Sequence, residues 1–512
     1  MGVLNANTLV DKAYTYDALG NMLSRKTGYG TLASETAIAP IIEAFQYDKI
    51  NRLTGYQMVG GDTGSNISTQ VQYDRIGNIS FKSDVGSYSY DPARPYRLTQ
   101  VALSAPSAAA LLPSANKALN MLYDDGLTGA KSNGSVLMGN GNLRCTIIAN
   151  SDGSRQARWQ TYTSFNAPTQ IALQTVDANF TCPANGALPT SPSTQLQFVY
   201  SPEHQRVKQV VTGGAQAGTT YYYNGNDSLD LSYEKTIKTN GVTEHKHYIS
   251  LPGSNGHWLL GQFVQRSGNL AANPASSRAA EEFNYFHQDA QGSTVAVSDA
   301  NGQTLERMAY DPWGDRRSVT GPSDPNNLIA AEKTDMGYTQ HEMLDEVGLV
   351  HMNGRIYDPT LGRMLTADIL VSYPERSTSY NRYAYALDNP LRFVDPTGWE
   401  VEDSVPNNPS GVNFGGDIAP VDYGIQSSSG SPQLVNSGQA KSLSAALEKA
   451  GQASLQFASY ALDQADNIIQ GGNGKVWTKQ SKMGVTQMLQ WHLVFHLDLL
   501  ESTHILVELE VF

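Results

Sequence analysis

One short unit recurs along the N-terminal part of the chain and constrains its fold more than any other feature. The unit reads apolar or aromatic, polar, aromatic, Asp, two variable residues, Gly or Asn, then Asn or Arg, and its copies are Tyr14–Asn21, Phe45–Arg52, Val71–Asn78 and the shorter Tyr88–Asp91. Alternating aromatic residues place two rings on one face of a strand. Asp then caps a turn, and Gly or Asn supplies the positive φ that returns the chain as the next strand.

Each copy is therefore a hairpin that can bury its aromatic face only against neighbouring copies. Successive aspartates of the unit are 31, 26 and 17 residues apart, so a strict solenoid period is excluded. With 46 Gly, 27 Tyr and only 16% charged residues, the composition also favours strands and tight turns. We expect one strand-dominated sheet over residues 10–399 with turns at Asp17–Asn21, Asp48–Arg52 and Asp74–Asn78, interrupted by a short helix at Asn116–Tyr123.

A second, denser set of motifs lies in residues 283–399. In chain order it comprises Tyr285–Asp289, Gly292–Thr294, Tyr310–Gly314, Gly337–Glu342, Gly348–Asp368, Tyr380–Tyr385, Asn389–Leu391 and Asp395–Gly398. The repeated unit resembles the YD repeats of the Rhs and teneurin-like families, and this second set resembles the Rhs repeat-associated core. The resemblance covers about residues 10–399 and implies a β-sheet spiralled into a hollow shell.

The resemblance, together with the composition, divides the chain into four parts. Residues 1–282 are expected to form the YD-repeat part of a mainly β shell, and residues 283–399 the core. Residues 400–440, rich in Asn, Pro, Gly and Ser, are typical of a flexible linker. Residues 441–512 form a small, partly helical tail at the position where relatives carry a variable toxin domain, and its abrupt apolar end leaves truncation or a shifted frame open.

The resemblance also implies a self-cleaving core. In several relatives two aspartates act like an aspartic-protease pair, and here Asp368 and Asp395 occupy those positions. Arg363, close to Asp368 in the sequence, is expected either to lower the pKa of one carboxyl or to orient it. The expected cut is the bond after Trp399. The chain departs from the family pattern where Ile369 replaces Pro and Trp399 replaces Leu. The alternative reading is that both aspartates only cap turns.

No metal or cofactor is expected. His492 and His496 have a metal-ligand spacing, but Leu493 stands where the zinc-protease pattern requires Glu. Cys145 and Cys182 are the only cysteines, and two unrelated thiols are favoured over one bridge.

Charge and hydropathy limit the partners and the location. The net charge of −13 and the lack of a basic stripe argue against nucleic-acid binding by the shell. No apolar run is long enough to span a membrane, and no standard signal peptide opens the chain. We therefore expect a secreted or cell-surface protein that is exported by a non-classical route.

Three functions fit these patterns. In the first, an Rhs-type polymorphic toxin, the shell encloses its own C-terminal tail as cargo, and a secretion machine and an immunity protein are partners. In the second, a cell-surface adhesion or structural protein binds glycans or cells and releases nothing. In the third, the chain is an orphan fragment.

Overall fold

The structure is a computed structural model that describes most of the chain up to residue 403. The described residues are 10–30, 39–61, 67–103, 118–124, 139–149, 154–177, 179–183, 186–224, 231–250, 259–273, 279–321, 329–374 and 376–403. The chain divides into two compact units, residues 1–420 and 421–512. The expected tail and its histidines, and the expected linker apart from residues 400–403, lie outside the described residues.

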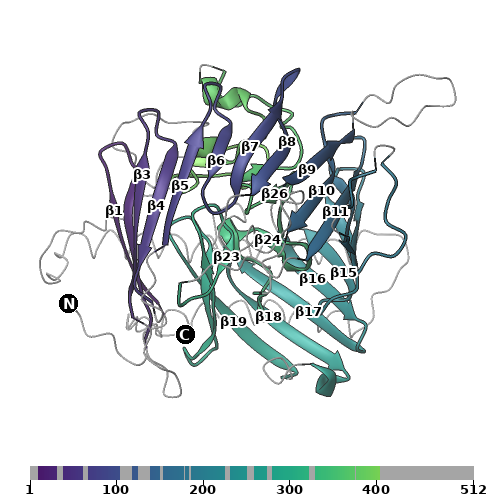
Figure 1. The fold of residues 1–512 in the computed structure, drawn as a ribbon. Helices are drawn as coiled ribbons and strands as arrows, with labels where there is room; N and C mark the ends of the chain where they lie inside the picture. Colours follow the sequence, from purple (N-terminus) through teal and green to yellow (C-terminus); the bar gives the residue numbers. More distant parts are fainter. Residues whose placement is uncertain are drawn as a thin grey trace, which may run out of the picture. The chain divides into compact units, whose positions relative to one another are not determined.

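The first unit is built on one antiparallel sheet of 21 strands, β1–β21, in which each strand pairs with the next strand of the chain (Figure 1). This confirms the prediction of a mainly β fold. The strands are β1 (Asp11–Tyr16), β2 (Met22–Gly28), β3 (Ile41–Tyr47), β4 (Leu53–Val59), β5 (Ile67–Tyr73), β6 (Ile79–Lys82), β7 (Gly86–Asp91), β8 (Arg94–Leu103), β9 (Ala118–Tyr123), β10 (Leu143–Ala149), β11 (Arg155–Tyr162), β12 (Pro168–Val176), β13 (Thr194–Tyr200), β14 (Arg206–Thr212), β15 (Gly218–Asn224), β16 (Leu231–Lys238), β17 (Val242–Ser250), β18 (Leu259–Gly268), β19 (Glu281–Gln288), β20 (Thr294–Ser298) and β21 (Thr304–Arg307).

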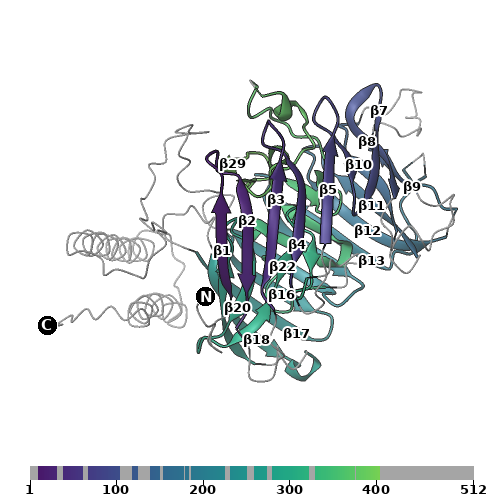
Figure 2. The same ribbon diagram turned by 60° about the vertical axis from the view of Figure 1, so that its left-hand side comes forward.

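The repeated unit forms the turns that join successive strands, as predicted. In the first copy Asp17 Oδ1 accepts hydrogen bonds from the backbone amides of Leu19 and Asn21, at 2.9 and 2.8 Å. The copies at Asp48 and Asp74 repeat these two bonds. Figure 2 shows the hairpins of β1–β5 side by side. The Asp of each unit therefore satisfies the backbone of its own turn, which fixes the register of the hairpin.

The tyrosine before that Asp links one hairpin to the previous one. The hydroxyl of Tyr47 donates to the carbonyl of Met22 at 2.8 Å, and that of Tyr73 donates to the carbonyl of Leu53 at 2.7 Å. The unit thus supplies both the turn and the bond between neighbouring repeats.

Two expectations about the sheet were wrong. The main sheet ends at Arg307 rather than near residue 399, because the core chain turns inward and forms only short sheets and 3₁₀ turns. The expected helix at Asn116–Tyr123 is strand β9, where Leu119, Met121 and Tyr123 alternate onto the buried face. The short elements of the chain are η3 (Leu270–Ala272), β22 (Ala309–Tyr310), β23 (Arg316–Arg317), η5 (Tyr338–Gln340), β24 (Glu342–Leu344), η6 (Asp345–Val347), β25 (Leu349–Met352), β26 (Arg355–Asp358), β27 (Arg363–Met364), η7 (Ser377–Tyr380), η8 (Ala386–Asp388), β28 (Phe393–Val394) and β29 (Glu402–Asp403).

The core chain after residue 308 packs on one face of the large sheet, the inner face, and contacts strands from both of its ends. Buried cations on the sheet make these contacts by binding acceptors of the core. The pairs are Arg25 with the carbonyl of Tyr310, Arg158 with Asp358, Arg206 with Glu342 and Lys246 with Asp335. The sheet therefore curves around the core.

Asparagines of the core also bind the turns of the repeats. Asn389 Nδ2 donates to Asn21 Oδ1 and to the carbonyl of Asn51, both at 2.8 Å. Asn381 Nδ2 donates to the carbonyl of Gly77 at 3.3 Å. Each of the three clearest YD turns is thus hydrogen-bonded to one short stretch of the core.

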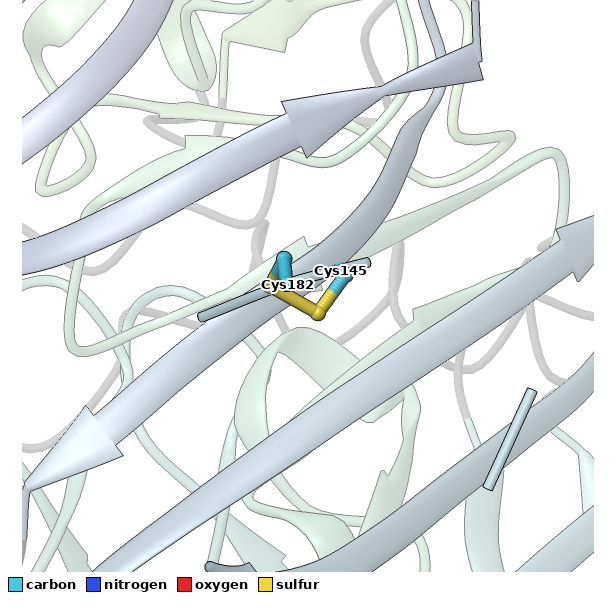
Figure 3. The surroundings of a disulfide bond; sticks show 2 residues. All are labelled: Cys145 and Cys182. Atoms are coloured by element: carbon cyan, nitrogen blue, oxygen red, sulfur yellow. A yellow bond between two sulfur atoms is a disulfide. The ribbon is translucent and has the colours of Figure 1, made fainter. Parts of the chain in front are cut away.

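The two cysteines form a disulfide, which corrects the expectation of unrelated thiols (Figure 3). Cys145 lies on β10 and Cys182 follows β12, and their Cα atoms are 5.9 Å apart. The meander of β10, β11 and β12 returns the later segment to β10, a long-range consequence of strand register that spacing in the sequence does not reveal. A disulfide is consistent with an oxidising compartment.

Candidate functional site

Asp368 and Asp395 lie 27 positions apart in the sequence, and one buried arginine joins them. Arg355, on β26, places Nη1 at 3.0 Å from Asp368 Oδ2 and Nη2 at 2.8 Å from Asp395 Oδ2. The exposed fractions of the three side chains are 2% for Arg355, 12% for Asp368 and 1% for Asp395. Burial at this level makes the pairing obligatory, because an unpaired charge here would be costly.

The turn that precedes the expected cleavage site packs directly on this arginine. Arg355 Nε donates to the carbonyl of Gly398, and its guanidinium lies over the Trp399 ring at 5.4 Å from the centroid. Gly398 has a φ of +76°, and a Cβ at this position would lie 1.9 Å from the carbonyl oxygen of Met352. Only glycine fits here, so the close approach of this turn to β25 is built into the sequence.

The chain on the two sides of the Trp399–Glu400 bond forms a small hairpin. Strand β28 pairs with β29, with Phe393 opposite Asp403. Within the turn, the backbone amides of Trp399 and Glu400 both donate to Thr397 Oγ1, at 3.1 and 3.0 Å. The bond is therefore held in a hydrogen-bonded turn beside Asp395, whose carboxyl interacts with the backbone amide of Glu400.

Contacts beyond the bond hold the outgoing strand. Arg392 pairs with Asp403 at 3.1 Å, and the hydroxyl of Tyr373 donates to the carbonyl of Val401 at 2.9 Å. The segment after the bond is thus anchored independently of the bond itself.

Burial sets the protonation of the two carboxyl groups. It raises the pKa of Asp395 to about 6, although Arg355 and the backbone amide of Glu400 act in the opposite direction. Burial also raises the pKa of Asp368, again against the effect of Arg355. Asp395 Oδ1 is buried and lacks a well-formed hydrogen bond within the described part of the chain. A carboxyl in this state can hold a proton near neutral pH and donate it.

The third residue expected at the site, Arg363, binds elsewhere. Its guanidinium donates to the hydroxyl of Tyr90 at 3.1 Å and to the carbonyl of Tyr96 at 2.7 Å, and it lies over the rings of Tyr90 and Tyr383. Arg355 is the cation that joins the carboxylates, and the sequence analysis missed it. One sequence feature could have identified it: Arg355 directly precedes the apolar strand residues Ile356 and Tyr357. An arginine that is buried in such a strand needs an acidic partner.

The described residues contain no group of three or more His, Cys, Asp or Glu side chains able to hold a metal ion. A search of the same residues finds no helix with the length and hydrophobicity needed to cross a membrane.

Comparisons with known proteins agree with the repeat and core motifs. Residues 268–391 match the family model of the teneurin YD-shell. The chain is 28% identical over 201 residues to the tRNA3(Ser)-specific nuclease WapA of Bacillus spizizenii and 27% identical over 201 residues to the tRNA nuclease WapA of Bacillus subtilis. Each alignment covers 39% of this chain and 7% of the relative, so the chain spans only a small part of those proteins.

A solved structure, the crystal structure of TcdB2-TccC3-TEV, is also similar. It aligns with a TM-score of 0.45 and 16% sequence identity, over 77% of this chain and 18% of that one.

Proposed function

We propose that this chain, whose repeats and core are of the Rhs/YD-repeat type, is the shell of a secreted toxin that cuts itself between Trp399 and Glu400. The observation that carries the proposal is the convergence of Asp368 and Asp395 on Arg355, beside the turn that presents this bond. In this proposal the segment from Glu400 onward is the cargo, and the core separates it from the shell. A secretion machine and an immunity protein are the partners that such a protein requires.

The two carboxyl groups are suited to hydrolysis of a peptide bond. One carboxylate must accept a proton from water while the other group supplies one to the leaving nitrogen. Asp368 is the more exposed of the two and acts as the base. Asp395 is buried, interacts with the backbone amide of Glu400 and acts as the acid.

The proposed step conserves atoms and charge. Water adds to the carbonyl carbon of Trp399 as Asp368 takes its proton. The carbon–nitrogen bond then breaks, its electron pair goes to the nitrogen of Glu400, and Asp395 donates the proton that completes the amine. The products are a carboxyl group at Trp399, whose proton passes to Asp395 and leaves the carboxylate, and a free amino group at Glu400. Arg355 holds both catalytic carboxyl groups in place.

Intact-mass analysis of the purified chain tests this proposal. The wild-type chain should separate under denaturing conditions into residues 1–399 and 400–512, whereas Asp368→Asn and Asp395→Asn should stay whole. Asp403→Asn is the matched control, because Asp403 lies near the bond but binds Arg392, and this variant should still be cut. A wild-type chain that remains whole from about pH 4 to pH 8 would favour the alternative in which both aspartates only cap turns.

A further inference from the structure

Two parallel rows of side chains cross the outer face of the sheet at strands β14–β17. Figure 1 shows β15, β16 and β17 as neighbouring strands of this sheet. The face is identified by the alternation of the strands: Tyr222, Lys246 and Gln262 point inward, where they bind Glu342, Asp335 and the carbonyl of Lys333 of the core. Residues of opposite parity on the same strands therefore point away from the core.

The first row is aromatic. Tyr223, Tyr233 and His247 stand directly opposite one another on adjacent strands, and the ring centroids are 5.2 Å and 4.9 Å apart. Tyr223 is 53% exposed, and Tyr233 and His247 are half-buried. The row is therefore a partly open strip of rings that runs perpendicular to the strands.

The second row contains two lysines and lies two residues away along each strand. Lys208, Tyr221, Lys235 and His245 are cross-strand partners in this order. Lys208 Nζ lies 5.6 Å from the centroid of the Tyr221 ring. His245 Nδ1 lies 2.6 Å from the hydroxyl of Tyr233, so a hydrogen bond ties the two rows together.

The charge of this strip is opposite to that of the chain. The outward positions of β15, β16 and β17 carry no carboxylate, and the two rows place Lys208 and Lys235 together in a chain with a net charge of −13. Burial lowers the pKa of His245 and of His247, so both are neutral hydrogen-bonding groups near pH 7. Both rows lie on the face of the sheet that points away from the core, which carries the proposed cleavage site. The strip is thus a local site for an anionic partner.

We propose that these rows bind an acidic polysaccharide. Adjacent strands are about 4.8 Å apart, close to the length of one pyranose unit, so an extended glycan lying across the strands can meet one side chain of each row per sugar. The aromatic row contacts the sugar C–H groups. The lysines bind the carboxylate or sulfate groups, and the neutral histidines bind the hydroxyls.

A single-stranded nucleic acid is the competing occupant, because bases stack on exposed aromatic rings beside basic side chains. Only Tyr223 of the row is largely exposed, and Tyr233 and His247 are half-buried, so successive bases would not each find an open ring. A glycan needs fewer open rings, because its hydroxyl and acidic groups also bind the lysines and histidines of the second row.

Binding of defined probes tests the proposal independently of self-cleavage, on the full-length chain with Asp395→Asn in the background. The probes are heparin, polygalacturonate, neutral dextran and oligothymidylate. We expect salt-sensitive binding of at least one of the two acidic glycans, weak or no binding of dextran, and a loss of about tenfold or more in affinity for the double variant Tyr233→Leu/Lys235→Gln. The matched control Lys26→Gln, on the exposed side of β2, should bind like the parent.

Three results would overturn the proposal: no binding of either acidic glycan, equal loss in the control, or tighter binding of oligothymidylate than of the glycans. Should the double variant fail to fold by circular dichroism, Tyr223→Ser replaces it, because Tyr223 is largely exposed and its loss should weaken binding without unfolding the strand.

Discussion

Replacement of Arg355 by Met should destabilise the first unit in a way that depends strongly on pH. Among the residues that the structure describes, Arg355 is the only cation that forms ion pairs with both Asp368 and Asp395. All three side chains are buried. Methionine fills much of the space but leaves Asp395 without the cation that pairs with it, and Asp368 with Arg382 as its remaining nearby cation. Removing one partner of a buried ion pair typically costs about 3–5 kcal/mol.

The sign of the pH dependence follows from the raised pKa of Asp395. A carboxyl with a folded-state pKa above its unfolded value makes the folded state more stable as pH falls through that folded-state pKa. Loss of Arg355 raises the pKa further, so the variant recovers stability when the pair takes up protons. At pH 7.5 we expect the full cost of about 3–5 kcal/mol, and at pH 5 about 1–2 kcal/mol, for the lost hydrogen bonds.

Differential scanning calorimetry at the two pH values measures this difference. For a unit of about 400 residues each kcal/mol corresponds to roughly 1 °C in Tm. The variant should therefore melt about 3–5 °C below the parent at pH 7.5 and about 1–2 °C below it at pH 5. Arg75→Met, at an exposed position of a YD turn, is the control and should change Tm little at either pH. An equal loss at both pH values, or none, would refute the reasoning.

Three further changes have defined outcomes. The Cys145–Cys182 disulfide closes a loop of 37 residues, and its reduction should lower the free energy of unfolding by about 4 kcal/mol through loop entropy. A reductant should therefore lower the Tm of the parent chain but leave the Tm of the variant with both cysteines replaced by serine unchanged. Asn389→Ala removes the hydrogen bonds to the first two YD turns and should cost about 1–3 kcal/mol, with faster amide exchange in those turns than in the turn at Asp299. Gly398→Ala cannot keep the turn beside β25, so Trp399 should leave the guanidinium beneath it, which tryptophan fluorescence detects, and self-cleavage should slow.

The hairpins could be predicted from sequence because each is fixed by residues close together in the chain. The Asp of a YD unit binds amides two and four residues later, and the glycine or asparagine that permits the turn lies within the same span. The approach of Asp368 to Asp395 was expected only through a resemblance to a family, not from spacing.

What could not be predicted depends on partners distant in the sequence. Arg355 finds its carboxylates 13 and 40 positions away, and the disulfide depends on the register of β10–β12. Strand β9 was mistaken for a helix because its short apolar pattern fits both periods, and only pairing with β8 and β10 decides between them. The boundaries proposed at residues 282 and 399 remain predictions.

The neighbour-only pairing of β1–β21 has a consequence for the way this protein is made. Each hairpin needs only the chain just before it, so the sheet can assemble strand by strand while the polypeptide is still emerging from a ribosome or a translocation pore. The inner face of the sheet cannot be completed in this way, because Asn21 forms its hydrogen bond with Asn389, which is made 368 residues later. Until the core segment arrives, Arg158 on β11 and Arg206 on β14 also lack Asp358 and Glu342, the carboxylates that pair with them. During synthesis the inner face of the sheet therefore stays exposed for a long time. We expect the yield of folded protein to depend on a chaperone that covers this face until the core is made.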